Sequence, residues 1–163
     1  MNNDPVDQSY WRREHPHPLA PNAHDVALYR ELIGDARTVL LLGNTPALMP
    51  LCTAALDLDP WDETGKSIRG DWTQNDTHFE AIIGDGVLNF TDGLARGVWE
   101  MAARTSDVFV ARAFRHRMPI MRVADNFPGE HDLGVAPTRF VQFDEYQFFQ
   151  WNFRELRASG FIH

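Results

Sequence analysis

The stretch "RTVLLLGNTPALMPL", Arg37–Leu51, decides how the chain folds. Its apolar run, Thr38–Leu42, is short and uninterrupted, which predicts a strand buried on both faces of a sheet. The run breaks at "GNTP" and continues as a segment, Ala47–Cys52, that favours a helix. A strand that passes through a tight turn into a helix is a common way to build a ligand site, although Gly43 is the only glycine of this turn.

Further segments with strand character alternate with segments of helical periodicity. The other predicted strands are Thr53–Asp57, Ser67–Trp72, Phe79–Gly84 and Asp107–Phe114. Helices are predicted from Asn22 to a stop at Gly34, after a Thr91 cap, and over Asp144–Ser159. This alternation, with few polar residues in the strands, predicts an α/β fold with a doubly wound, mostly parallel sheet covered on both faces.

Composition limits the kind of protein that this can be. A length of 163 residues suits one domain, and we divide it into an arm, residues 1–21, and a single α/β domain, residues 22–163. The net charge of −8 argues against nucleic acid and against an anionic membrane surface as partners. The single cysteine, Cys52, excludes an internal disulfide and predicts a cytoplasmic protein. The seven histidines show no metal-ligand spacing, so no metal site is predicted.

Polar residues and glycines recur where the predicted strands end. They are Gly43-Asn44, Asp57, Asp71-Trp72 and Asp85-Gly86. In open parallel sheets, ligands bind beyond the carboxyl ends of the strands. In the first turn, Gly43 would allow close approach of a ligand, and Thr45 and Pro46 would start the helix. Exposed N–H groups at that helix start would favour a carboxylate.

The order of these motifs resembles that of the class I S-adenosylmethionine-dependent methyltransferases. "VLLLGNTPAL" looks like a variant of their first motif, and "ALDLDP", "RGDW" and "FEAIIGDGVLNF" look like the second, third and fourth. The resemblance covers residues 37–115 and implies a methyltransferase-like Rossmann variant with S-adenosylmethionine as cofactor. It departs from the family in the first turn, where an acidic residue and several glycines are usual, and in "RTSD", where Pro-Gly-Gly is usual.

The resemblance also implies roles for individual residues. Gly43 and Asn44 would lie against the methionine part of the cofactor, and Asp57 would accept hydrogen bonds from its ribose hydroxyls. Asp71 would receive the adenine amino group, with Trp72 against the ring. Asp85 and Gly86 would lie near the sulfonium and the substrate entrance. Asp57 and Asp85 could instead simply start turns at strand ends.

The C-terminal region departs from the family pattern in this interpretation. The family fold ends with an antiparallel strand pair, which the predicted helix over residues 144–159 leaves absent, or replaced by a single strand such as "TRFVQF". On that helix, one face would carry Tyr146, Phe149 and Phe153, leaving Phe148 and Trp151 uncovered. These rings could line a substrate pocket, but we favour an interface, and so predict a homodimer or a heteromeric partner.

Methyl transfer is a single displacement, so a base is needed only if the acceptor must first lose a proton. His116, at the end of the fifth predicted strand, is the best-placed candidate, followed by Tyr146 and Glu145. The sequence thus favours S-adenosylmethionine-dependent methyl transfer to a small-molecule acceptor. The alternatives are a non-catalytic member of the fold, acting as a cofactor-binding or partner subunit, and a nucleotide-binding α/β domain of another kind.

Overall fold

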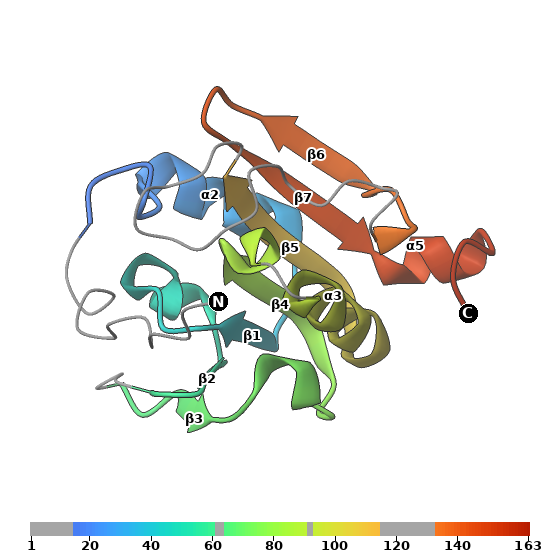
Figure 1. Cartoon of the computed structure of the whole chain (residues 1–163), viewed down its shortest axis with the longest axis horizontal. Helices are drawn as coiled ribbons and strands as arrows, with labels where there is room; N and C mark the ends of the chain where they lie inside the picture. Colours follow the sequence, from blue (N-terminus) through green and yellow to red (C-terminus); the bar gives the residue numbers. More distant parts are fainter. Residues whose placement is uncertain (1–14, 61–63, 91–92, 115–132) are drawn as a thin grey trace.

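One mixed sheet organises the molecule (Figure 1). The computed structural model describes residues 15–60, 64–90, 93–114 and 133–163. Within these residues the sheet has seven strands in the order β3-β2-β1-β4-β5-β7-β6. The first five strands pair in parallel, and β7 runs antiparallel to both of its neighbours. The strands are β1 (Val39–Leu42), β2 (Ala54–Asp57), β3 (Ser67–Arg69), β4 (Phe79–Asp85), β5 (Ser106–Phe114), β6 (Arg139–Gln142) and β7 (Tyr146–Asn152).

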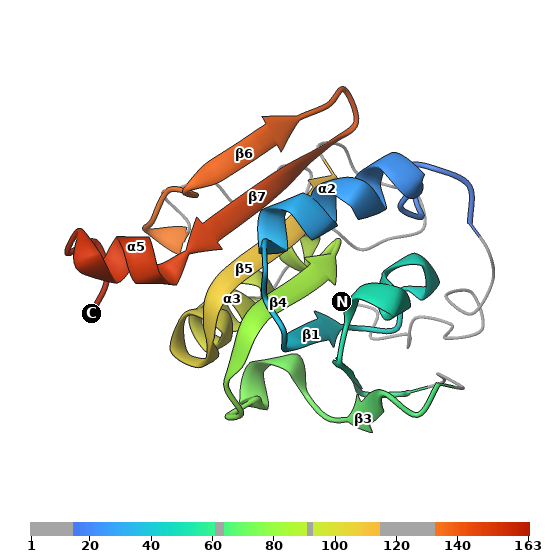
Figure 2. The ribbon, with the colours of Figure 1, turned by 180° about the vertical axis from the view of Figure 1, so that it is seen from behind.

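Helices cover both faces of the sheet, as Figures 1 and 2 show from opposite sides. The α-helices are α2 (Ala23–Ile33), α3 (Leu94–Thr105) and α5 (Phe153–Ala158), and the 3₁₀-helices are η1 (Pro46–Leu51), η2 (Trp72–Gln74) and η3 (Val87–Asn89). One core cluster joins α3 and α5 to one face of the sheet, and the other joins α2 and η1 to the opposite face. The fold is therefore a doubly wound α/β sheet, as predicted.

The predicted elements up to β5 are present with small shifts at their ends. Helix α2 starts at the predicted Asn22, whose side chain accepts a hydrogen bond from the Asp25 backbone N–H at 2.8 Å, and it ends at Gly34. The helix after the "GNTP" turn is the 3₁₀-helix η1, and the Thr45 side chain makes no capping bond to it. Thr91 lies outside the described residues, and α3 follows Gly93.

The prediction of a long last helix is wrong. Residues 146–152 form β7, which pairs with β6 and β5, and only the short α5 follows. The antiparallel strand pair that seemed to be missing is therefore present, and "TRFVQF" contains its edge strand, β6. Aromatic residues favour strands, and a strand directs successive side chains to opposite faces. Here both faces are covered by helices, so an aromatic run without clear alternation of polar residues suits the strand.

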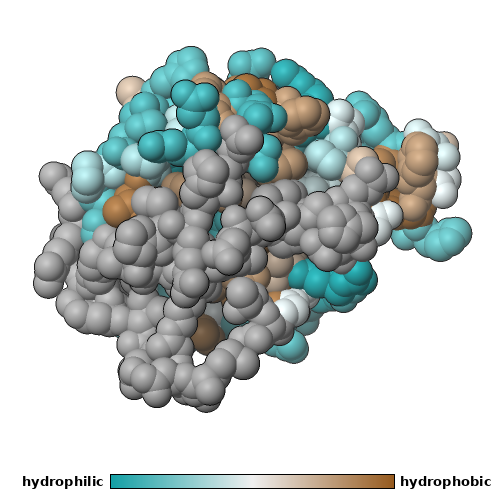
Figure 3. Space-filling view, turned by 45° about the horizontal axis from the view of Figure 1, so that its top comes forward, coloured by the Kyte–Doolittle hydropathy of each residue, from teal (hydrophilic) through white to brown (hydrophobic). Residues whose placement is uncertain are grey.

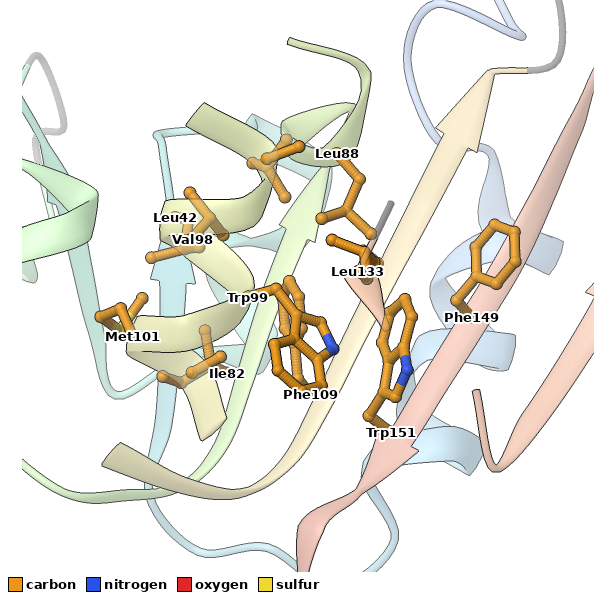
Figure 4. Packing of buried hydrophobic residues seen from close by; sticks show 14 of the residues in the cluster. Leu42, Ile82, Leu88, Val98, Trp99, Met101, Phe109, Leu133, Phe149 and Trp151 are labelled. Carbon is orange, nitrogen blue, oxygen red and sulfur yellow. The ribbon is translucent and has the colours of Figure 1, made fainter. Parts of the chain in front are cut away.

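Burial of the β7 rings removes the basis of the predicted interface. Phe148 is 0% and Trp151 1% exposed, so neither can contact a partner. Trp151 stacks on Phe109 and on Phe149, and Trp99 of α3 meets it edge-on (Figure 4). The surface in Figure 3 mixes hydrophobic and hydrophilic residues over the part of the chain that is described. Across the described residues, whichever face they lie on, the large exposed hydrophobic side chains are Leu58, Ile68, Phe140 and Phe161.

Candidate functional site

The carboxyl ends of β1, β2 and β4 meet at one edge of the sheet. Leu42 pairs with Leu56 of β2 on one side and with Gly84 of β4 on the other. The residues that follow these three are therefore neighbours as well: Gly43, Asp57 and Asp85. This is the edge at which open α/β sheets bind ligands.

Gly43 brings two predicted cofactor residues together. Its φ of +99° is in the region that favours glycine. A Cβ built on Gly43 would lie 3.7 Å from Asp57 Oδ2 and 3.8 Å from Trp72 Cζ2. The Trp72 indole is fixed by a 2.7 Å hydrogen bond from its Nε1 to the Leu56 carbonyl, and it meets the Phe90 ring edge-on. A carboxylate and an aromatic ring thus border the space above a bare stretch of backbone.

Asp57 has hydrogen-bonding capacity to spare. It ends β2 and is half-buried. Its Oδ1 accepts a 2.8 Å hydrogen bond from the Asp59 backbone N–H, while Oδ2 faces the Gly43 side. Burial raises the pKa of Asp57 above its ordinary value, because removing a carboxylate from water penalises the charged form. Donors supplied by a ligand would relieve that penalty.

Asn44 supplies a buried polar group without a partner. The residue is 4% exposed, and its Oδ1 accepts a 2.6 Å hydrogen bond from Ser67 Oγ of β3. Among the residues that the structure describes, no acceptor lies within reach of its Nδ2. A buried amide N–H without an acceptor costs about 1–3 kcal/mol, so such a group is typical of a site completed by a ligand.

Asp71 directly precedes Trp72 in the sequence, and its carboxylate bonds within its own turn. It caps η2, and its Oδ1 accepts hydrogen bonds from the Thr73 backbone N–H at 2.8 Å and from Thr73 Oγ1 at 2.7 Å. Its side chain is exposed. The bonds place Trp72 at the start of η2, so Asp71 supports the position of the ring whether or not it also meets a ligand.

Asp85 and Gly86 lie in a different environment from Asp57. Asp85 accepts two hydrogen bonds from the Arg112 guanidinium, at 2.6 Å from Nε and 2.9 Å from Nη2. Arg112 is fully buried and also donates to Asp25 Oδ2 at 3.2 Å. Burial alone would lower the pKa of Arg112, but the charge and hydrogen bonds of Asp85 outweigh it and hold that pKa above its ordinary value. Gly86 turns the chain with φ +72° and donates its N–H to the Arg112 carbonyl.

The Tyr29 side chain of α2 reaches the paired ends of β4 and β5. Its hydroxyl donates to the Gly84 carbonyl at 2.8 Å and accepts from the Arg112 N–H at 3.1 Å. The register of β4 and β5 pairs these two backbone groups with each other as well, so the hydroxyl adds to the ladder at this point. Burial, and then the charge of Asp85, raise the pKa of Tyr29 well above its ordinary value, so the phenol keeps its proton.

Of the three predicted catalytic residues, the structure describes two, Tyr146 and Glu145. Tyr146 starts β7 and is buried, and its hydroxyl donates to Asp25 Oδ1 at 2.7 Å. Burial, reinforced by that bond to Asp25, raises the pKa of Tyr146 to about 12. Glu145 is exposed in the turn between β6 and β7. His116 lies outside the described residues.

Sequence reasoning missed the partners of Tyr146 and Asp85. These are His17, Asp25 and Arg112, which form with them one polar cluster at the start of α2. The sequence held one usable signal: Arg112 interrupts an apolar run that was predicted to be a buried strand, and a buried charge requires a partner. Its partners could not be identified, because Asp25 is 87 residues away in the chain.

Comparison with known proteins supports the fold at low sequence identity. No family model matches the chain, and no curated protein matches it significantly in sequence. Magnesium protoporphyrin IX methyltransferase (ChlM) from Synechocystis PCC 6803 with bound SAH superposes with a TM-score of 0.53 at 12% identity, over 89% of this chain and 94% of that chain. The N-terminal domain of EvdMO1 with SAH bound gives 0.53 at 14% identity, over 81% of this chain and 80% of that chain.

A third similar structure is a putative RNA methyltransferase, PH1948 from Pyrococcus horikoshii. Its TM-score is 0.51 at 14% identity, over 77% of this chain and 80% of that chain. None of the helices in the described residues has the length and apolar character needed to cross a membrane. The strand order, the antiparallel β7 and these similarities together show that the chain has the fold of the class I S-adenosylmethionine-dependent methyltransferases.

Proposed function

We propose that this protein binds S-adenosylmethionine at the ends of β1, β2 and β3 and transfers its methyl group to a small-molecule acceptor. The observation that carries the proposal is the convergence of the Asp57 carboxylate and the Trp72 ring on the backbone of Gly43. The fold and the SAH bound to two structurally similar proteins support the choice of cofactor.

The residues present fit the chemical groups of this cofactor. Asp57 Oδ2 would accept hydrogen bonds from ribose hydroxyls, and the Trp72 ring offers an apolar surface for adenine. Gly43 has no side chain to obstruct a ligand. The buried Asn44 amide has a donor without a partner among the described residues, which suits an oxygen of the cofactor. When bound, the cofactor supplies an electrophilic methyl group on a sulfonium.

The strand pair at the C-terminus removes the main argument for a non-catalytic subunit. That alternative rested on an apparently shortened sheet, whereas β6 and β7 complete it. The net charge of −8 favours a small molecule over a nucleic acid as acceptor, although a putative RNA methyltransferase is among the structurally similar proteins.

Isothermal titration calorimetry with S-adenosylmethionine and with S-adenosylhomocysteine tests the proposal. We expect both to bind the wild-type protein. Asp57→Ala should weaken binding by about 1.5–3 kcal/mol, because ribose hydroxyls would lose hydrogen bonds to a charged acceptor. Asp76→Ala is the matched control, since Asp76 is exposed in the loop before β4, at the opposite edge of the sheet.

Two results would count against the proposal. A wild-type protein that binds neither compound would reject the cofactor. Equal weakening by Asp57→Ala and Asp76→Ala would show that the effect comes from net charge alone, and it would remove the ribose role from Asp57.

A further inference from the structure

His17 is the point at which the polar cluster of α2 reaches the surface. Its Nε2 lies 3.1 Å from Asp25 Oδ2 and 3.0 Å from the Tyr146 hydroxyl. The His17 side chain is 37% exposed, whereas those of Asp25 and Arg112 are 0% exposed. An imidazole that is anchored at one nitrogen and partly exposed is suited to proton transfer.

The hydrogen bonds around Asp25 determine which ring nitrogen of neutral His17 carries the proton. Tyr146 uses its single hydroxyl proton on Asp25 Oδ1, and its pKa of about 12 keeps that proton in place. Asp25 Oδ2 accepts from Arg112 Nη1 and from the Asn22 N–H, so both carboxyl oxygens act as acceptors. His17 Nε2 therefore faces two acceptors and must donate. In neutral imidazole the lone pair is then on Nδ1.

Within the described residues, the bonds of the His17 ring all go through Nε2. The residues that bond the His17 imidazole, and those that bond its partners, come from four different helices and strands. Asp25 comes from α2, and Tyr146 from β7. Arg112 of β5, with Asp85 of β4, fixes the carboxylate of Asp25. This is the arrangement in which a carboxylate orients a histidine and stabilises the imidazolium that forms.

The cluster lies at the same edge of the sheet as the proposed cofactor site but over different strands. Tyr146 pairs with Phe114, the last residue of β5, so both lie at the edge where β4 ends in Asp85. Gly43, Asp57 and Trp72 occupy the β1–β3 side of this edge. An acceptor placed over β4, β5 and β7 would therefore lie between the proposed cofactor site and His17.

We propose that His17 is the catalytic base for an acceptor that presents a hydroxyl group, a phenol or an alcohol; this proposal rests on the proposed function. The acceptor's proton moves to His17 Nδ1 while its oxygen forms a bond to the methyl carbon. The bond between that carbon and sulfur breaks, its electron pair remains on sulfur, and the proton later leaves the imidazolium for water. Carboxylic acids are already deprotonated at neutral pH and do not need such a base.

Nitrogen NMR of histidine-labelled protein tests the arrangement without any acceptor. The His17 signals, assigned by their loss in His17→Gln, should show the Nε2–H tautomer for the neutral ring. In Tyr146→Phe, which keeps Asp25 and the ring, this preference should persist, because Asp25 still accepts. A neutral His17 that is mainly in the Nδ1–H form, or that exchanges freely between the two, overturns the proposal whatever the acceptor.

The kinetic test uses radiolabelled S-adenosylmethionine with a panel of phenols, alcohols and carboxylic acids. His17→Ala should lower kcat for a hydroxyl acceptor by about 10²- to 10⁴-fold and leave S-adenosylhomocysteine affinity unchanged. Added imidazole should restore part of the kcat, which it would not do for a structural defect. The control is His24→Ala, because His24 is exposed at the start of α2, next to Asp25, and its ring meets the Phe143 ring edge-on.

The outcomes separate the two proposals. Absence of cofactor binding by the wild-type protein rejects the proposed function. Normal binding together with an unchanged kcat in His17→Ala rejects the role of His17 alone. A wild-type protein that methylates only carboxylic acids also overturns this proposal, because its acceptor would need no base.

Discussion

Asp57 and Asp85 both end a strand at the same edge of the sheet, yet their surroundings are opposite. Asp57 is half-buried, accepts hydrogen bonding from the backbone of its own turn and has its pKa raised by burial. Asp85 is held by two hydrogen bonds from a buried guanidinium and lies beside the Tyr29 hydroxyl. A carboxylate with spare acceptor capacity is suited to a ligand, and one that is already saturated is suited to holding the fold together.

This difference divides the edge into two halves. The β1–β3 half contains the Asn44 amide, whose Nδ2 has no partner among the described residues, and the half-buried carboxylate of Asp57. The β4–β7 half contains the ion cluster of Asp25, Asp85 and Arg112, which opens to solvent through His17. Substitutions should therefore affect mainly ligand binding in the first half, whereas substitutions of the buried ions of the second half should affect mainly stability.

The largest effect is expected from Arg112→Met. It leaves two carboxylates, Asp25 and Asp85, buried without their cation, which should cost about 3–5 kcal/mol of unfolding free energy. Chemical denaturation measures this. The control is Arg154→Met: Arg154 is 74% exposed and pairs with Asp107, so its loss should cost about 0–1 kcal/mol. Equal costs for the two variants would show that the buried cluster is not structural.

Gly43→Ala should combine a smaller stability loss with loss of cofactor binding. An L-residue at φ +99° costs about 1–2 kcal/mol, and the new methyl would stand 3.7 Å from Asp57 Oδ2. Gly160→Ala is matched to it, with φ +77° and nothing within 4 Å of its added Cβ. Both variants should be destabilised, but only Gly43→Ala should show no binding of S-adenosylmethionine in calorimetry. Normal binding by Gly43→Ala would mean that "GNTP" is only a turn.

The smallest effect concerns the pH dependence of stability. Because the pKa of Asp57 is higher in the folded protein than in the unfolded chain, the folded state binds its proton more tightly. The contribution of Asp57 to stability is therefore present at low pH and is lost as pH rises from the ordinary aspartate pKa through the raised one. Asp57→Asn should flatten this fall in unfolding curves measured without ligand. A variant with an unchanged pH profile would contradict the assigned environment of Asp57.

Much of the first half of the edge could be predicted from the sequence, because its signals are local. The run before Gly43, the Asp57 that ends β2 and the Trp72 of "RGDW" are each recognisable within a few residues. The second half depends on pairs that are distant in the chain, such as His17 with Tyr146, which are 129 residues apart. No local pattern could reveal them.

The β7 strand was missed for a different physical reason. A strand covered on one face alternates apolar and polar residues, but β7 is covered on both faces, so the period of two is hidden. The near-continuous run "YQFFQWNF" then also fits a helix, and length alone did not separate the two.

The hydroxyl of Tyr29 has a consequence for local unfolding of the protein. Because it bonds both the Gly84 carbonyl and the Arg112 N–H, this hydroxyl ties α2 to the paired ends of β4 and β5. α2 cannot leave this part of the sheet without breaking both of these buried hydrogen bonds. In hydrogen exchange, the Arg112 amide and the amides of α2 should therefore gain protection as one cooperative unit, with the helix acting as part of the sheet.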